Sequence, residues 1–215
     1  MGGDATDALA SSASSPHPFR HMTEKPCLVC GHDAFEPHLE ILLRCVACGF
    51  VTARLDAPVD ARSLYEGDYF TGEEYLDYAA DEAFFRRNFR RRLEGILRRR
   101  RGGRLLEIGA AYGFFLDLAR THFDVLGFDV NPAAVRYARE VLHLDVRADD
   151  FLRLTPGAIE PVDVTVMWDV IEHLERPDLF LERIAEVSRP GALLYITTGD
   201  IGSRLARWRG RRWRL

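Results

Sequence analysis

Between residues 104 and 198, short apolar runs alternate with longer segments of helical periodicity. The runs predict strands at 104–109, 125–129, 145–148, 162–169 and 192–198. The periodic segments predict helices at 114–121, 132–142 and 178–188, and Arg189, Pro190 and Gly191 predict a turn before the last strand. Alternating strands and helices predict a parallel sheet with right-handed crossovers, so the expected fold class is α/β.

A basic amphipathic segment precedes this alternation. From Ala83 to Arg101, apolar residues recur at helical spacing and arginines fill the remaining face. The apolar positions are Phe85, Phe89, Leu93, Ile96 and Leu97. We interpret the segment as a surface helix docked through its apolar stripe and ended by Gly102 and Gly103. Binding of RNA or anionic lipid by the arginine face is the alternative.

Composition divides the remaining chain. Residues 1–26 are rich in Ala, Ser, Pro and Asp without periodicity, which predicts a disordered tail. Residues 27–55 hold all the cysteines, residues 56–103 form a linker or helical lid, and residues 104–215 form the main domain. Residues 50–81 are dense in aromatic side chains, which either pack on the main domain or cover a ligand. The lid candidates are Tyr65, Tyr69, Phe70, Tyr75 and Tyr78.

The four cysteines form two C-x-x-C-G motifs with fourteen residues between the inner pair. Each motif predicts a tight turn that points two thiolates at one ion, so Cys27, Cys30, Cys45 and Cys48 predict a tetrahedral zinc site. With four thiolate ligands the ion has no open position, so its role is expected to be structural. Two disulfides or a redox pair are the alternatives.

The charge and length of the chain limit the classes of binding partner that we expect. The chain has 215 residues, a formal charge of −4 and 47% apolar residues, enough for one packed domain with an appendage. The negative net charge gives no general attraction to nucleic acid, so we favour a small-molecule partner, with nucleic acid as the alternative. No apolar run is long enough to cross a membrane, and residues 1–22 lack an apolar signal core. The chain is therefore expected to be cytoplasmic, without a membrane partner.

The chemistry is concentrated at EIGAAYG, residues 107–113. Gly109 ends the first strand and Gly113 precedes the first helix, while Asp129 ends the second strand twenty residues after Gly109. An acidic residue there accepts hydrogen bonds from ribose hydroxyls, so the pattern predicts a nucleoside pocket. The third glycine of a dinucleotide fingerprint is missing, which favours S-adenosylmethionine, a ligand without phosphate. A nicotinamide enzyme or a purely structural turn are the alternatives.

Over Arg104 to Gly199 the chain resembles class I S-adenosylmethionine-dependent methyltransferases. The matching motifs are EIGAAYG, GFDVNP, WDVIEHLERP and SRPGALLYITT. With the cysteine motifs and YFTGEEY, the chain is similar to bacterial methyltransferases with an N-terminal zinc ribbon, including the sugar C-methyltransferases. The resemblance implies a Rossmann-like sheet with five of the family's seven strands. The missing final helix and two strands lead us to expect a fragment, with a free sheet edge prone to aggregation or dimerisation. The oligomeric state itself is not indicated.

The resemblance also implies the donor site. Its members would be Glu107, Gly109, Ala110, Gly113, Asp129, Val130, Asp149, Asp150, Phe151, Trp168 and Asp169. The residues of the first motif would line the methionine end, and Asp129 would hold the ribose. Val130, Asp149, the Asp150 backbone and Phe151 would contact adenine, with Phe151 as a stacking partner. Trp168 and Asp169 would lie near the reacting methyl group. Ala111 is a departure, since many members have glycine there.

Methyl transfer is an in-line displacement that depends mainly on alignment, and a base is needed only for some acceptors. The candidates for this base are Asp169, Glu172 and His173, and we take Asp169 and His173 as catalytic. Two alternatives remain: Glu172 and His173 only open the next helix, or all three residues form a second metal site. The expected acceptor is a small molecule, such as a nucleotide-linked sugar or a natural-product or polysaccharide intermediate. An RNA methyltransferase and a non-catalytic donor-binding or scaffold protein are the other functions considered.

Overall fold

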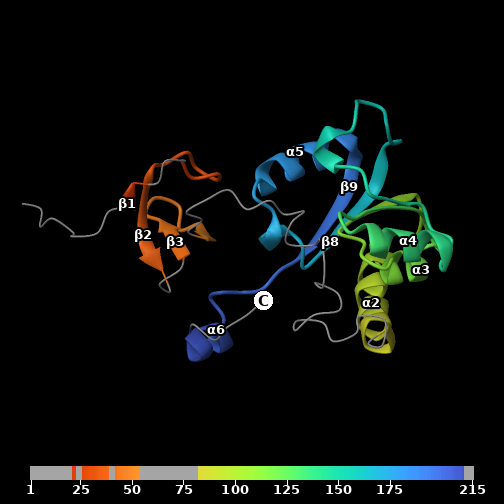
Figure 1. The fold of residues 1–215 in the computed structure, drawn as a ribbon, viewed down its shortest axis with the longest axis horizontal. Helices are drawn as coiled ribbons and strands as arrows, with labels where there is room; N and C mark the ends of the chain where they lie inside the picture. Colours follow the sequence, from red (N-terminus) through yellow and green to blue (C-terminus); the bar gives the residue numbers. More distant parts are fainter. Residues whose placement is uncertain (1–20, 23–25, 39–41, 54–81, 211–215) are drawn as a thin grey trace, which may run out of the picture. The chain divides into compact units, whose positions relative to one another are not determined.

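The computed structural model describes residues 21–22, 26–38, 42–53 and 82–210, coloured in Figure 1. Their contacts divide the chain into two units, Met1–Arg54 and Leu55–Leu215, and we describe each by itself. The aromatic residues considered as a lid lie outside the described residues. So does most of the segment predicted to be a disordered tail.

The first unit is a small antiparallel sheet. Its strands are β1 (His21–Met22), β2 (Ala34–His38), β3 (Leu42–Cys45) and β4 (Val51–Ala53), paired in that order. Phe35 pairs with Cys45 across β2 and β3. Phe35 and Leu43 are buried with two of the cysteines, and Phe50 packs against them. This apolar core is very small, so packing alone contributes little to the stability of the unit.

The second unit contains the predicted parallel sheet. Its strands are β5 (Arg104–Ile108), β6 (Asp124–Phe128), β7 (Val146–Arg147), β8 (Val162–Trp168) and β9 (Ser188–Thr197). They lie in the order β7-β6-β5-β8-β9, and every neighbouring pair is parallel. The order reverses at β5, so the ends of β5 and its neighbours form the crevice where such sheets bind ligands. We call this side, where the strands end, the carboxyl edge.

Helices cover both faces of the sheet, which confirms the α/β prediction (Figure 1). The helices are α2 (Glu82–Leu97), α3 (Phe114–Ala119), α4 (Pro132–Glu140), α5 (Pro177–Val187) and α6 (Arg204–Arg209). Two short 3₁₀ helices are η2 (Phe151–Arg153) and η3 (Ile171–His173). Side chains of α2, α3 and α4 share one core cluster with one face of the sheet. Those of η2 and α5 share a second cluster with the other face.

Helix α2 has the predicted apolar stripe. Phe89, Leu93 and Ile96 are buried, and the Phe89 ring packs edge-on against Phe115 of α3, with 5.6 Å between centroids. The helix ends at Leu97, four residues before the predicted end. Beyond it, Arg100 forms an ion pair with Asp163 at the start of β8. That contact draws the chain toward the sheet before the two glycines are reached.

The turn predicted at residues 189–191 is instead a bulge within β9. Val162 pairs with Ser188, but Val164 pairs with Leu193, so Asp163 alone faces residues 189–192. Its carboxylate is only 2% exposed and accepts hydrogen bonds from Arg100, Arg189 and the Arg104 backbone N–H. The Arg104 N–H and the two guanidinium groups lower the pKa of Asp163. Asp163 therefore joins the starts of three strands.

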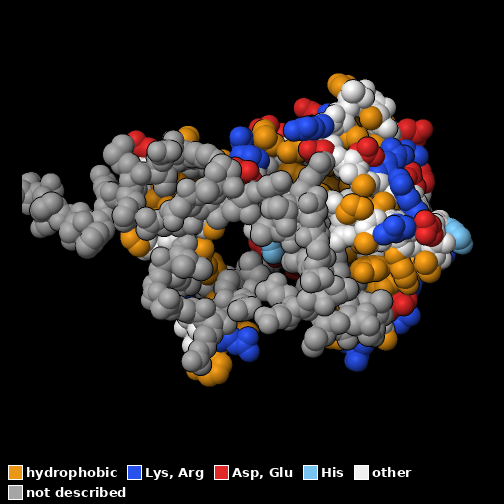
Figure 2. Space-filling model, in the orientation of Figure 1, with side chains coloured by type: hydrophobic (Ala, Val, Ile, Leu, Met, Phe, Trp, Pro, Cys, Tyr) orange, Lys and Arg blue, Asp and Glu red, His pale blue; other side chains and the backbone are white. Residues whose placement is uncertain are grey.

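Charges of both signs are mixed over the surface. Figure 2 shows basic and acidic side chains next to one another on the visible face of the second unit. Many are paired, as in the contacts Arg104–Asp124 and Arg176–Asp178. Within the described ranges, no helix combines the length and the apolar character needed to cross a bilayer.

Candidate functional site

The turn after β5 is held against β6 and curves sharply. The N–H groups of Gly109 and Ala110 both donate to the Phe128 carbonyl, at 2.8 and 3.0 Å. Gly109 has a φ of 76° and Gly113 a φ of 80°, conformations that favour glycine. A Cβ on Gly109 would lie 2.3 Å from Val170 Cγ2. One on Gly113 would lie 2.7 Å from Leu144 Cδ1, so this glycine allows helix packing rather than only ligand approach.

Ala111, which departs from the glycine that the family resemblance implies, also adopts the left-handed conformation, with a φ of 45°. A non-glycine residue there costs about 1–2 kcal/mol. The Ala111 N–H donates a 2.7 Å hydrogen bond to Asp129 Oδ2. This bond to a buried carboxylate offsets part of the strain and ties the turn to the end of β6.

Asp129 lies directly after β6 and is 9% exposed. Its two carboxylate oxygens accept from the N–H groups of Ala111, at 2.7 Å, and Asn131, at 2.8 Å. Burial raises the pKa of Asp129, and the two N–H donors oppose that rise. Each oxygen retains a further lone pair for a ligand hydroxyl. Asn131 caps α4, its side chain accepting from the N–H groups of Ala133 and Ala134.

Glu107 is the second buried carboxylate at this edge. It is 2% exposed, and its Oε2 atom has no hydrogen-bond partner among the residues that the structure describes. Burial raises the pKa of Glu107 well above its usual range, the nearby Asp129 charge raises it further, and Arg92 lowers it. A buried carboxylate oxygen without a donor is costly, so the geometry favours a ligand that supplies one.

The cation near these carboxylates is Arg92, which the sequence interpretation did not single out. Its guanidinium carbon lies 4.8 Å from the centroid of the Trp168 ring, and its Nη2 atom lies 3.2 Å from Asp169 Oδ2. Trp168 ends β8, and its ring also packs edge-on against Phe115. The structure thus brings Trp168 and Asp169 together with a residue of α2. Nine arginines occur between residues 83 and 101, so no local pattern distinguishes this one.

The residues expected around adenine are placed differently from one another. Val130, after β6, is 43% exposed, and Asp149, after β7, is exposed. Asp150 uses its side chain to cap η2, accepting from the Leu152 N–H at 3.1 Å. Phe151 is 3% exposed, with its ring between Phe128 and Phe180, at centroid distances of 5.5 and 6.0 Å. This corrects the stacking hypothesis, because a ring packed in the core has no free face for adenine.

Glu172 and His173 lie in η3, just after the carboxyl edge. Glu172 Oε2 is buried and lacks a hydrogen-bond partner within the described part of the chain. The ligand atoms of Asp169, Glu172 and His173 do not form a metal-binding group there, since the described cysteines are the only such group found. The second metal site considered from sequence is therefore not formed in this conformation.

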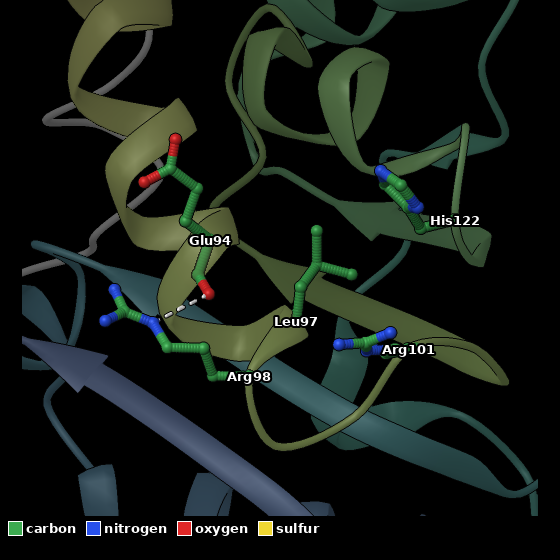
Figure 3. Close-up of a pocket in the computed structure, with 5 residues that line it drawn as sticks. All are labelled: Glu94, Leu97, Arg98, Arg101 and His122. Atoms are coloured by element: carbon green, nitrogen blue, oxygen red, sulfur yellow. Dashed lines mark hydrogen bonds between the residues drawn. The ribbon is translucent and has the colours of Figure 1, made fainter.

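A shallow pocket lies at the opposite edge of the sheet. Figure 3 shows its lining, with Arg98 turned back so that its Nε donates to the Glu94 carbonyl at 3.3 Å. The lining residues are Glu94, Leu97, Arg98, Arg101 and His122. They come from the end of α2 and from the loop before β6, where the strands begin. The pocket is thus separate from the carboxyl edge and its buried carboxylates.

In the first unit, the four cysteines converge. All four Sγ atoms lie within 4.8 Å of one another, with Cys27–Cys48 and Cys30–Cys45 both at 3.6 Å. A tetrahedral site with Zn–S bonds of about 2.3 Å places its sulfurs about 3.8 Å apart, close to these distances. All four thiols are free of disulfides. The Cys48 backbone N–H is the main cause that lowers the pKa of Cys45, to about 6, and favours a thiolate there.

The two motifs adopt the same turn. The N–H of Gly31 donates to the Cys27 carbonyl at 2.8 Å, and the N–H of Gly49 donates to the Cys45 carbonyl at 2.9 Å. Each first cysteine in turn donates its N–H to a carbonyl five residues later, in His32 or Phe50. The paired turns that the spacing predicted are therefore present.

Comparison with known proteins agrees with this fold. A family model described as a methyltransferase domain matches residues 77–215. The ubiquinone biosynthesis O-methyltransferase of Chelativorans sp. (strain BNC1) is 32% identical over 105 residues, which are 45% of this chain and 40% of that protein. The enzyme of the same name from Sinorhizobium medicae (strain WSM419) is 33% identical over 103 residues, 45% of this chain and 41% of that protein. The chain thus spans about two fifths of the length of these curated relatives.

A solved structure gives the same architecture. The N-methyltransferase NodS from Bradyrhizobium japonicum WM9, in complex with S-adenosyl-L-homocysteine, aligns with a TM-score of 0.50 and 22% identity. The alignment covers 64% of this chain and 72% of NodS, and it supports the fold alone. The family model, in contrast, covers well over half of the chain. The chain belongs to the methyltransferase domain family.

Proposed function

We propose that this chain binds S-adenosylmethionine at the carboxyl edge of its parallel sheet and transfers the methyl group to a small-molecule acceptor. The observation that carries the proposal is the pair of buried carboxylates, Glu107 and Asp129, at the ends of β5 and β6. Neither forms an ion pair within the described part of the chain, although each is almost fully buried. A ligand with hydroxyl and amino donors would complete both groups.

The residues present fit the donor. Asp129 would accept hydrogen bonds from the ribose hydroxyls through its free lone pairs. Glu107 would accept from the amino group through Oε2, and Arg92 would donate to the α-carboxylate. When bound, S-adenosylmethionine supplies an electrophilic methyl group on a sulfonium. The chain's own contribution is to orient that group beside Trp168 and to keep water away from it.

The acceptor class is supported by relatives rather than by a pocket. The curated relatives are named O-methyltransferases, which favours an oxygen acceptor on a small molecule. A nucleotide-linked sugar and a natural-product intermediate remain the classes that we propose from the sequence. A hydroxyl acceptor would require a base, and Asp169 is the better placed candidate because its exposed carboxylate stands at the carboxyl edge. His173, four residues after Asp169 at the end of η3, is the second candidate.

We also propose that the cysteine cluster holds one structural zinc ion. Its four sulfurs approach tetrahedral spacing, and the apolar core around them is too small to fold the unit strongly by itself. Four thiolates would complete the coordination of the ion, leaving no position for a substrate. The ribbon would therefore contribute stability rather than methyl-transfer chemistry.

The donor site is tested by titrating the full chain with S-adenosylhomocysteine in a calorimeter. We expect one site per folded chain. Replacing Asp129 by Ala should weaken binding by about 1–3 kcal/mol, since a buried charged acceptor of the ribose is lost. Asp124→Ala is the matched control, because Asp124 is an exposed acid at the other end of the same strand. Equal affinities for the wild type and Asp129→Ala would remove Asp129 from the site.

A further inference from the structure

Arg92 already has a partner in this conformation, and that partner is Asp169, at the carboxyl edge of the sheet. Its Nη2 atom lies 3.2 Å from Asp169 Oδ2, and its guanidinium covers the Trp168 ring. Glu107 points to the same face of the sheet as Leu105, the face covered by α2. Arg92 therefore belongs to the helix that covers the face to which Glu107 points, and it pairs with the exposed Asp169.

We propose that Arg92 exchanges its ion-pair partner when the donor binds. In the free chain Arg92 pairs with Asp169, and in the donor complex it pairs with the α-carboxylate of S-adenosylmethionine. Asp169 is then released and accepts a hydrogen bond from the acceptor's hydroxyl or amine. This inference rests on the proposed function and adds an order to it, in which the donor binds first and thereby frees Asp169 for the acceptor.

The exchange requires little rearrangement of Arg92. The contact between the guanidinium and the indole of Trp168 does not depend on Asp169, so it holds the cation at the edge while its partner changes. The Arg92–Asp169 contact is single, and the Asp169 side chain is 56% exposed. An ion pair so open to solvent is weak. Two carboxylates beside one guanidinium repel each other, so arrival of the ligand's α-carboxylate favours the release of Asp169.

Asp169 stays in place without Arg92. Its backbone N–H donates to the carbonyl of Thr197 at 3.0 Å and lies 3.1 Å from the Thr197 hydroxyl oxygen. Its backbone, with a left-handed φ of 58°, is thus held at the end of β8 by contacts that do not involve Arg92. Once released, the Asp169 carboxylate thus remains at the carboxyl edge and does not move with the arginine.

The test compares two ligands by calorimetry on the full chain. S-adenosylhomocysteine has the α-carboxylate, whereas 5′-methylthioadenosine keeps the adenosine and the sulfur but lacks the amino-acid end. Asp169→Asn removes the competing partner, and asparagine tolerates the left-handed backbone, so the variant is expected to fold. We expect it to bind S-adenosylhomocysteine about two- to fivefold more tightly, because the free energy of a weak exposed ion pair corresponds to a change of that size in the binding constant. Its affinity for 5′-methylthioadenosine should be unchanged.

Two further variants complete the test. Arg92→Met should weaken S-adenosylhomocysteine binding about tenfold or more without affecting 5′-methylthioadenosine, and it should abolish the gain from Asp169→Asn in the double variant. Arg91→Met, on an exposed neighbour in the same helix, should change neither affinity.

Unchanged or weaker binding of S-adenosylhomocysteine by Asp169→Asn would overturn the exchange while leaving the donor site intact. Equal tightening for both ligands would also overturn it, because the α-carboxylate would then have no part in the effect. A folded wild-type chain that binds neither ligand would overturn the proposed function and the exchange together.

Discussion

At the scale of single residues, the carboxyl edge contains groups that do not stabilise the unliganded fold. Glu107 is buried with one carboxylate oxygen lacking a donor in the described structure, and Ala111 adopts a conformation that disfavours alanine. Both features cost free energy in the unliganded chain. Each therefore gives a substitution expected to raise stability, which is unusual for a buried or turn position.

We expect Glu107→Gln to raise the free energy of unfolding by about 1–2 kcal/mol at pH 8, with weaker binding of S-adenosylhomocysteine. The pKa of Glu107 is raised in the folded state, so the unfolded state loses its proton first. Stability should therefore fall as pH rises from about 4.3, the unfolded value, to the raised folded value. Denaturant unfolding between pH 5 and pH 8 should show a steeper slope in the wild type than in the variant, in which the raised pKa of Asp129 still gives a slope of the same sign.

The exposed acid Glu186 provides the control for this pH profile. Glu186→Gln should leave the slope of stability against pH unchanged. A slope in Glu107→Gln as steep as that of the wild type would mean that Glu107 does not cause it.

For Ala111→Gly we expect a gain of about 0.5 kcal/mol. Relief of the left-handed strain, about 1–2 kcal/mol, exceeds the added chain entropy of glycine in the unfolded state. Ala110→Gly is the matched control, since Ala110 is a buried neighbour without a positive φ and should destabilise the chain. Thermal unfolding of both variants measures the difference. Destabilisation by Ala111→Gly equal to that by Ala110→Gly would contradict the strain at residue 111.

The sequence made part of this site predictable. Asp129 follows an apolar run at a fixed distance from a glycine turn, and both signals are local. Arg92 was not predictable, because its role comes from the packing of α2 against α3 and from its position over Trp168. Phe151 was assigned wrongly for a similar reason. Its place between two other aromatic rings depends on η2 and α5, which the local sequence does not relate to each other.

At the scale of elements, Asp163 links the approach to β5, the start of β8 and the bulge of β9. The carboxylate is buried, whereas the Arg100 and Arg189 side chains that pair with it are partly exposed. The observed bulge includes the three residues, 189–191, that were predicted to form a turn. Local sequence does not indicate that Ser188 already pairs with Val162, which is why the start of β9 was placed too late.

Asp163→Asn should lower the free energy of unfolding by about 2–3 kcal/mol at pH 7, because two arginines and one backbone N–H lose a charged acceptor. The folded pKa of Asp163 is lowered, so its contribution is full above about pH 3.9, the unfolded value, and is lost as pH falls through the lowered folded value. Acid unfolding followed by circular dichroism should therefore lose this component in the variant.

Asp124→Asn serves as the comparison, since Asp124 pairs with Arg104 at an exposed position. We expect a change below about 1 kcal/mol there. Equal effects of the two substitutions would show that Asp163 is no more important than a surface acid.

At the scale of the whole molecule, the chain consists of two units with different sources of stability. The second unit has two apolar clusters, one on each face of its sheet, whereas the first has a small cluster around its cysteines. Periodicity predicted the larger unit because its strands and helices have clear apolar patterns. The smaller unit was recognised from cysteine spacing alone, which defines two turns but not the four short strands around them.

Removing the proposed zinc ion should therefore affect one unit only. We expect about one zinc per chain in freshly purified protein and two thermal transitions. A strong chelator should abolish or lower the transition of the ribbon while leaving the other and the binding of S-adenosylhomocysteine unchanged. Cys45→Ser should reproduce the chelator's effect without added chelator. Much less than one zinc per chain, or loss of both transitions together, would contradict an independent zinc-held unit.

The position of Trp168 makes its fluorescence a natural probe of the carboxyl edge. The chain has three tryptophans, of which Trp168 is half-buried beneath a guanidinium and Trp208 is 81% exposed. A cation over an indole changes its emission, so we expect the proposed change of counter-ion at Arg92 to alter the fluorescence of Trp168. Occupation of the edge is therefore observable in rapid mixing without any attached dye, on the time scale of the binding event itself.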